Sequence, residues 1–342
     1  MGLEIETGEQ KQIIGKVTKF LEEKVKVERK STGIVTNTRI THATPAALYG
    51  HSPSRYWEDD SKVPPASRKS CKDLARQLIE NDPGRNINVL LGGGRRHWLP
   101  KVAHDPEQTK DEGRRLDGRN LIDDWARDKK KRGLKAEYVW NKGQLDKINP
   151  NQVDYLLGLF AYSHMDFEAD RDPGPTGDPS LADMTRSALS ILLKNPKGFF
   201  LFVEGGRIDH AHHYNNAYRA LDETLAMETA LLAALALINP TETLIVVTSD
   251  HSHVLTMGGQ ATPRGHPILD VTYRPSEFPT EQESSEFSPS SQFTQAPGDL
   301  ITVLAIFDAC IGRRDPAIGN SQPDRRAANQ SSRPRCQRAL LR

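Results

Sequence analysis

The chain has 342 residues and a formal net charge of +1, with 27% of the residues charged. A chain of this length can bury a large core, and its balanced charge excludes a global field that would recruit nucleic acid or an anionic membrane. Its cysteines (Cys71, Cys310 and Cys336) are too few and too scattered for a disulfide framework or a zinc ribbon. No apolar run is long enough to span a bilayer, and residues 1–12 lack the apolar core of a signal peptide.

The apolar pattern predicts several helices in chain order. Residues 10–29 are typical of an amphipathic helix that covers a sheet. Helices are also predicted over 70–81 and 119–132, with a charged loop over 103–118 between them. Residues 178–180 provide a start signal with proline in the first turn, for a helix that runs to about residue 194. A longer helix is predicted over 211–238.

Short continuous apolar runs predict strands at 32–36, 88–91, 198–203 and 244–248. Such runs suit strands of a parallel sheet that helices cover on both faces. Because ligands gather outside the carboxyl ends of strands in open α/β sheets, we expect the four strand ends to face one region.

The composition changes after about Asp270, which suggests one large α/β domain over 1–270 and a divergent, disordered tail over 271–342. Ser, Pro, Gln and Glu dominate 275–297, and 313–342 is rich in Arg, Ser, Pro and Asn without periodicity. Residues 299–311 are compatible with either one amphipathic helix or a strand.

Carboxylates and imidazoles follow two of the predicted strands, and a threonine follows a third. The candidate metal ligands are Thr44, Glu204, Asp209, His213, Asp250 and His251. Asp209 and His213 are four residues apart, so both project from one face if this segment is helical. Zinc accepts imidazole nitrogen and carboxylate oxygen, whereas Glu204 and Thr44 supply the hard oxygens that magnesium prefers. The pattern indicates a hydrolytic metal centre.

Other polar features have plainer interpretations. Lone histidines such as His97, His104 and His164 are interpreted as ordinary surface or core residues. The glycines at 92–94 indicate a tight turn rather than a phosphate cradle, because no P-loop lysine and serine follow them. Arg55 taken alone would be an ordinary surface arginine.

Longer motifs, at 41–45, 55–57, 91–95, 178–181, 204–213 and 250–253, carry a family resemblance. Over residues 15–268 the chain resembles alkaline phosphatase of the animal type. The resemblance implies a doubly wound, mostly parallel sheet with helices on both faces. It also implies a homodimeric enzyme that hydrolyses phosphate monoesters through a phosphoserine, with two zinc ions and one magnesium.

The resemblance also implies roles for single residues. Arg55 matches the arginine that grips the substrate phosphate, and a planar guanidinium suits this role because it binds two oxygens at once. The implied ligands are Asp209 and His213 for the first zinc, Asp250 and His251 for the second, and Glu204 and Thr44 for magnesium, with His42 and His253 in the surrounding shell.

The chain departs from the family pattern at both ends of the motif region. The nucleophilic serine and a bridging aspartate of the family lie upstream of the His42 motif, where the one serine of this sequence is Ser31, which belongs to the strand that follows. The third histidine of the first zinc lies downstream, yet the last histidine here is His266. Each zinc site is therefore expected to lack a family ligand, and the nucleophile to be absent.

Two functional hypotheses follow from these departures. The first is an alkaline phosphatase chain, truncated at both ends and of reduced activity; the alternative is a non-catalytic metal-binding fragment or pseudoenzyme of the same family. Cys71 resembles a half-cystine whose partner lies upstream in relatives, so a free thiol is expected. Members of the family are located at the outer face of the plasma membrane or outside the cell, and this location is an expectation from the resemblance. The sequence of this chain does not by itself indicate a location.

Overall fold

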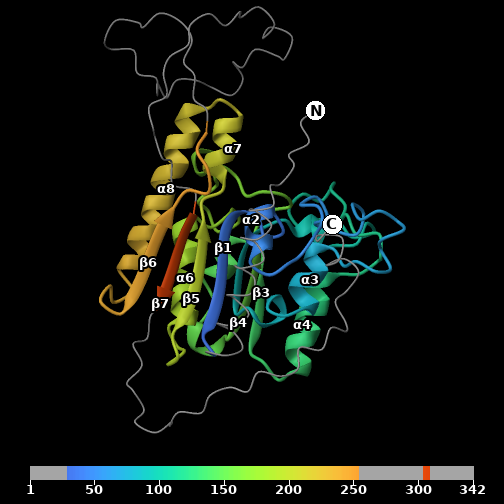
Figure 1. Ribbon diagram of the computed structural model, residues 1–342, viewed down its shortest axis with the longest axis horizontal. Coiled ribbons are helices and arrows are strands. Elements are labelled where there is room, and N and C mark those ends of the chain that lie inside the picture. Colours follow the sequence, from blue (N-terminus) through green and yellow to red (C-terminus); the bar gives the residue numbers. More distant parts are fainter. Residues whose placement is uncertain (1–28, 254–302, 309–342) are drawn as a thin grey trace, which may run out of the picture.

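The computed structural model describes residues 29–253 and 303–308, and within them it forms one sheet flanked by helices (Figure 1). Its seven strands lie in the order β3-β4-β2-β1-β5-β7-β6. The strands are β1 (Ser31–Arg39), β2 (Val89–Gly93), β3 (Ala136–Val139), β4 (Tyr155–Leu159), β5 (Phe199–Glu204), β6 (Thr243–Thr248) and β7 (Val303–Asp308). The α-helices are α2 (Ala43–Ala47), α3 (Leu74–Glu80), α4 (Leu121–Lys131), α5 (Lys142–Leu145), α6 (Leu181–Leu192), α7 (Arg207–His213) and α8 (Ala217–Leu235). Short 3-10 turns are η1 (Gly84–Asn86), η2 (Arg95–His97), η3 (Pro150–Gln152) and η4 (Glu168–Asp170).

The four predicted strands are β1, β2, β5 and β6, and they run in one direction. β1 pairs in parallel with β2 and with β5, with Gly33 opposite both Val89 and Leu201. β6 has the same direction as β5, because each pairs antiparallel with β7 between them. The carboxyl ends of all four strands therefore lie at the same edge of the sheet.

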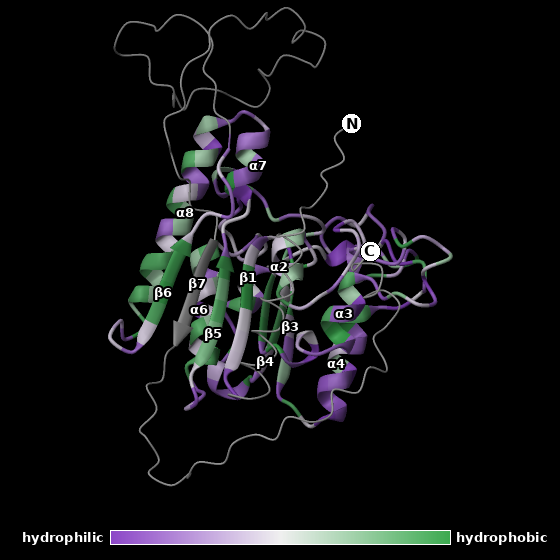
Figure 2. Ribbon diagram, viewed as in Figure 1, coloured by the Kyte–Doolittle hydropathy of each residue, from purple (hydrophilic) through white to green (hydrophobic). Residues whose placement is uncertain are grey.

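Both faces of the sheet are covered, as expected for a doubly wound α/β fold. Alternate residues of β5 point to opposite faces. Leu201 and Val203 belong to a core with α6 and α8, whereas Phe200 and Phe202 belong to a second core with α3 and α4. Figure 2 shows the apolar residues concentrated in the strands and polar residues in the loops beyond their ends. Each fully buried large side chain contributes about 1.5–3 kcal/mol, which makes the sheet a rigid base for those loops.

Helix α6 begins with a reciprocal cap. Ser180 Oγ accepts the Asp183 amide at 3.1 Å, and Asp183 Oδ2 accepts the Ser180 amide at 3.2 Å. The predicted start is confirmed, but Ser180 rather than an earlier residue is the cap. Pro179 therefore precedes the helix instead of lying in its first turn.

The single helix predicted over 211–238 is wrong, because the structure has α7 and α8 with a break at 214–216. Asn215 adopts a φ of 52°, which asparagine tolerates better than most residues. Asn216 then caps α8, its side chain accepting the Arg219 amide at 3.0 Å. These local hydrogen bonds compete with a continuous helix, and the break turns α7 toward the strand ends.

Strand β6 also differs from expectation, since it is not covered on both faces. Leu244 is 55% exposed and Val246 is 38% exposed. Among the described strands β6 has β7 as its single neighbour, so it forms an edge. Part of 299–311 is the strand β7, one of the two alternatives for that segment. The division of the chain at residue 270 stays a prediction, and the helix predicted over 10–29 lies outside the described residues.

Two further features concern the cysteines and the membrane. Cys71 is disulfide-bonded, so the expectation of a free thiol is wrong. That expectation had placed its partner outside the chain. Across 29–253 and 303–308, no helix combines the length and the apolar character that a membrane crossing requires.

A candidate metal centre at the carboxyl edge of the sheet

The turn from β5 into α7 positions the first group of polar side chains. Glu204 ends β5, and Gly205 and Gly206 connect it to α7. A Cβ atom on Gly206 would lie 2.4 Å from Thr38 Cγ2 and 3.0 Å from the Glu204 carboxyl carbon. Glycine at this position therefore lets the turn pass directly over the end of β1.

Asp209 lies at the centre of a group of imidazoles, which we call the Asp209 cluster (Asp209, His213, His251 and His253). His213 Nε2 lies 3.5 Å from Asp209 Oδ2 across one turn of α7. His251 Nε2 and His253 Nε2, from the segment after β6, each lie 3.8 Å from Asp209 Oδ1. The structure thus joins the two sequence motifs, and their role as metal ligands stays a prediction.

The donor atoms of this cluster are arranged as in a cation site. One ligand atom from each of Asp209, His213 and His253 lies within 4.8 Å of the other two. Asp209 Oδ1 is buried and has no hydrogen-bond partner among the described residues. Asp250 lies beside the cluster, with Oδ2 3.5 Å from His251 Nε2. A buried carboxylate oxygen without a donor, surrounded by imidazoles, is chemically suited to zinc.

Glu204 forms a second polar centre next to the first. It is only 2% exposed, and its Oε2 accepts hydrogen bonds from Thr36 at 2.6 Å and Thr38 at 3.2 Å. Burial raises the pKa of Glu204 to about 7 against the opposing hydrogen bonds, which include one from Thr44, and the charge of Asp250 also raises it. Thr44 is therefore beside Glu204, as the implied magnesium site requires.

Sequence reasoning missed Thr36 and Thr38 as partners of this carboxylate. Both lie on β1, two residues apart, so their side chains point to the same face of the sheet. The available signal was a pair of threonines at alternate positions directly after the apolar residues Ile34 and Val35 of this strand.

Arg55 and His42 lie close together beside these polar groups. Arg55 Nη2 is 3.3 Å from His42 Nε2, and Arg55 is exposed. Burial lowers the pKa of His42 to about 4, and the charges of Arg39 and Arg55 lower it further. Arg55 is therefore in contact with a histidine of the motif region, and its role as the phosphate-binding arginine stays a prediction.

His164, interpreted from the sequence as ordinary, packs against two histidines of the motifs. Its ring centroid lies 4.4 Å from that of His210 and 5.1 Å from that of His42. Burial lowers the pKa of His210 to about 3, and burial lowers the pKa of His164 strongly as well. The missed signal is that His164 follows β4, whose carboxyl end lies at the same edge as those of β1 and β5.

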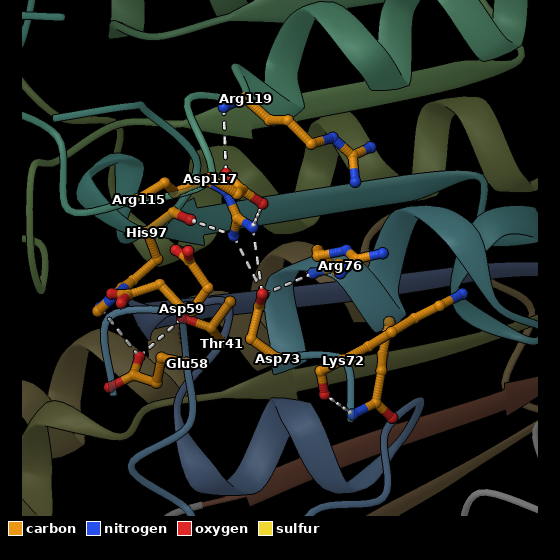
Figure 3. A network of polar contacts seen from close by, with 12 residues as sticks. Thr41, Glu58, Asp59, Lys72, Asp73, Arg76, His97, Arg115, Asp117 and Arg119 are labelled. Atoms are coloured by element: carbon orange, nitrogen blue, oxygen red, sulfur yellow. Dashed lines mark hydrogen bonds and ion pairs between the residues drawn. The ribbon is translucent and has the colours of Figure 1, made fainter. Parts of the chain in front are cut away.

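A buried network of charged residues holds the loop that carries Arg55 (Figure 3). Glu58 binds Arg39 through two contacts of 2.8 Å and accepts the Thr41 hydroxyl at 2.7 Å. Asp59 pairs with buried His97 at 2.5 Å, and this contact gives His97 a structural role in the network. Farther along, the Arg115 guanidinium binds the Asp73 carboxylate, which caps α3.

The protein has a mostly parallel α/β sheet, and carboxylates, imidazoles and an arginine lie at the carboxyl edge of this sheet. These features define the class of the protein: an α/β protein with a candidate site for metal-dependent hydrolysis. A comparison with known families makes the assignment specific. The chain belongs to the alkaline phosphatase family, whose sequence profile matches residues 4–301.

Known relatives agree with this assignment. The human tissue-nonspecific alkaline phosphatase is 49% identical over 246 residues, which cover 71% of this chain and 46% of the relative. A membrane-bound alkaline phosphatase of Bombyx mori is 45% identical, covering 70% of this chain and 43% of that protein. The crystal structure of Thermus thermophilus alkaline phosphatase is similar with a TM-score of 0.52 and 33% identity, over 68% of this chain and 41% of that one. The chain thus spans about half the length of these curated relatives.

Proposed function

We propose that this chain forms the metal and phosphate-binding part of a phosphomonoesterase of the alkaline phosphatase type. The observation that supports the proposal most directly is the approach of His251 and His253 to Asp209, each at 3.8 Å. Residues 42 and 44 positions apart in sequence from Asp209 meet around one buried carboxylate oxygen that has no hydrogen-bond partner among the described residues. Packing alone gives no reason for that arrangement.

The donor sets divide by chemistry. Asp209 and His213 would hold one zinc ion and Asp250 and His251 a second. Glu204 and Thr44 would hold magnesium, since they offer oxygen donors. When bound, such ions supply positive charge that stabilises the attacking and leaving oxygens of a phosphoryl transfer.

The remaining work falls to the protein's own side chains. Arg55 would bind two oxygens of a phosphate monoester and orient it over the Asp209 cluster. The Glu58–Arg39 pair and the Asp59–His97 pair hold the loop of Arg55 in place. Binding and orientation are therefore the functions that this chain supports best.

An assay with a generic aryl phosphate tests the proposal. The purified chain should release phosphate when zinc and magnesium are added, and release should fall to background after chelation. An Asp209→Asn variant should lose the metal-dependent part, whereas Asp111→Asn, an exposed carboxylate on a distant loop, should not.

One observation favours a second candidate, a metal-binding protein of this family without turnover. Ser31, the serine that precedes the His42 motif, lies at the opposite end of β1 and donates to Leu192 O at 2.9 Å. It lies far from the edge that carries Arg55, so it cannot serve as the attacking group there. Zinc binding without phosphate release would select this second candidate.

Assembly and location follow from the family as further proposals. A homodimer is expected by resemblance, and sedimentation of the purified chain would test it. A place at the outer face of the plasma membrane or outside the cell is likewise proposed by resemblance, and the name of the membrane-bound Bombyx mori relative supports association with a membrane.

A further inference from the structure

We propose that His42, His164 and His210 form an additional binding site for a divalent transition ion such as Zn²⁺, Cu²⁺ or Ni²⁺. This trihistidine site lies beside the Asp209 cluster but shares no residue with it. The inference is independent of the proposed function, because it concerns a different set of ligands from those proposed to hold zinc and magnesium.

Three segments that are distant in sequence bring the imidazoles together. His42 precedes α2, His164 follows β4, and His210 is on α7. One ring nitrogen from each lies within 4.8 Å of the other two. The rings meet at steep angles of 68° to 81°, so they approach edge to face rather than stack.

One ring nitrogen of the group has unused hydrogen-bonding capacity, whereas both nitrogens of His164 contact Arg39. His42 Nδ1 is buried and has no hydrogen-bond partner among the described residues. A buried polar atom without a partner is costly, and a bound cation would satisfy it. The group of three rings therefore contains one buried imidazole nitrogen whose hydrogen-bonding capacity is unused among the described residues.

The composition of the group selects the ion. Its three ligands are all imidazoles, which suit zinc, copper and nickel, whereas magnesium and calcium prefer oxygen. Zinc–nitrogen bonds of about 2.0–2.1 Å place tetrahedral ligand atoms about 3.4 Å apart. Side-chain rotations of modest size would bring the three nitrogens to that separation.

Positions on α7 separate this site from the Asp209 cluster. His210 follows Asp209 directly, so its side chain points about 100° away around the helix axis. Asp209 and His213, four residues apart, share the other face. Two ions could therefore be held by one short helix on different faces.

Arginines around the trihistidine site set its affinity. Arg39 contacts Nε2 of His164, and Arg207 Nη1 lies 3.1 Å from His210 Nδ1. Glu58 neutralises Arg39 through its bidentate pair, which lowers the electrostatic cost of a nearby cation. An incoming ion must displace the Arg39 contact with His164, so its affinity is expected to be lower than in a site without cationic neighbours.

Metal titration of the full chain tests the inference. The chelator-treated protein would be titrated with Co²⁺ and followed by visible absorption and equilibrium dialysis. His164→Ala is the test variant, and His104→Ala, an exposed histidine on a separate loop, is the matched control. Compared with wild type and His104→Ala, His164→Ala should lose one equivalent of bound Co²⁺ or bind it about tenfold more weakly or worse. Unchanged stoichiometry and affinity in His164→Ala would overturn the proposal.

A second measurement on the unmodified chain guards against a variant that does not fold. Copper with ascorbate oxidises histidines that ligate the metal, and peptide mass spectrometry locates the product. Oxidation should concentrate at His42, His164 and His210 and be low at His104. Equal oxidation of His164 and His104 would count against a site at these three residues.

Discussion

His251, which follows the edge strand β6, has its Nε2 atom 3.8 Å from Oδ1 of Asp209 on α7. The contact joins two motifs through the tertiary fold, but at this distance it is not a hydrogen bond, and Asp209 Oδ1 has no hydrogen-bond donor among the described residues. The cost of burying a carboxylate in this state is offset if a cation binds there.

Replacing this carboxylate should therefore weaken zinc binding strongly. In Asp209→Asn, the neutral amide removes the anionic ligand, and zinc affinity should fall by about tenfold or more. Isothermal titration with Zn²⁺ measures the change, with Asp111→Asn as control. Equal affinity in both variants would show that the Asp209 cluster is not a zinc site.

Thr44→Val should reduce magnesium binding with little effect on stability. The valine keeps the shape of the side chain but removes the hydroxyl that donates to Glu204. Loss of a ligand or of its supporting hydrogen bond typically lowers metal affinity by about 10–100-fold. The control is Thr229→Val on the exposed side of α8, where the hydroxyl donates to Leu225 O. A magnesium titration that does not distinguish the two variants would contradict the prediction.

Arg55→Lys should weaken the binding of inorganic phosphate. A lysine retains the charge but loses the planar pair of donors, so the Kd should rise by about tenfold. Arg127→Lys, with 72% of its side chain exposed on α4, is the matched control. Phosphate affinity that survives in Arg55→Lys would remove Arg55 from the anion site.

Glu223 should make the stability of the fold depend on pH. Burial raises its pKa to about 7, although Asn37 and the Glu168 amide donate to it at 2.8 and 2.7 Å. A carboxyl group with a raised pKa stabilises the fold fully below its unfolded pKa of about 4.5 and loses that contribution as the pH rises to about 7. The loss is on the order of 3 kcal/mol.

Denaturant unfolding at about pH 5 and about pH 8 measures this effect. Glu223→Gln should show a smaller decline of the unfolding free energy between these values than wild type. Glu228→Gln, an exposed position on the same helix, should decline as wild type does. A Glu223→Gln curve parallel to that of wild type would refute a raised pKa at this position.

Gly206→Ala should destabilise the turn that presents Asp209. The added Cβ would lie 2.4 Å from Thr38 Cγ2, and the tight packing at the end of β1 leaves no room for it. A loss of about 1–3 kcal/mol in the free energy of unfolding is expected. At the adjacent Gly205 the nearest atom would be Met227 Sδ at 3.3 Å, so Gly205→Ala should cost less. Thermal unfolding of the two variants side by side makes the comparison.

The local pattern of the sequence was sufficient for the strands β1, β2, β5 and β6 and for the helices α3, α4 and α6, whereas β3, β4, α2 and α5 were not predicted. Apolar runs such as that of β5 identify strands because burial on both faces of a sheet requires them. Ser180 and Asp183 could be found for the same kind of reason, since a helix cap depends on residues three apart. The motifs around Asp209 and Asp250 also predicted a metal-type chemistry, because few other functions need carboxylates and imidazoles at such spacing.

Only the tertiary structure decided which of these groups meet. His164 was interpreted from the sequence as an ordinary residue, and its place beside His42 and His210 depends on β4 and β1 lying in one sheet. The break between α7 and α8 and the exposure of β6 depend in the same way on long-range packing. Local sequence determines which conformations and which ligand atoms are available, whereas the distance between Asp209 and His251 is determined by the order and direction of the strands that carry them.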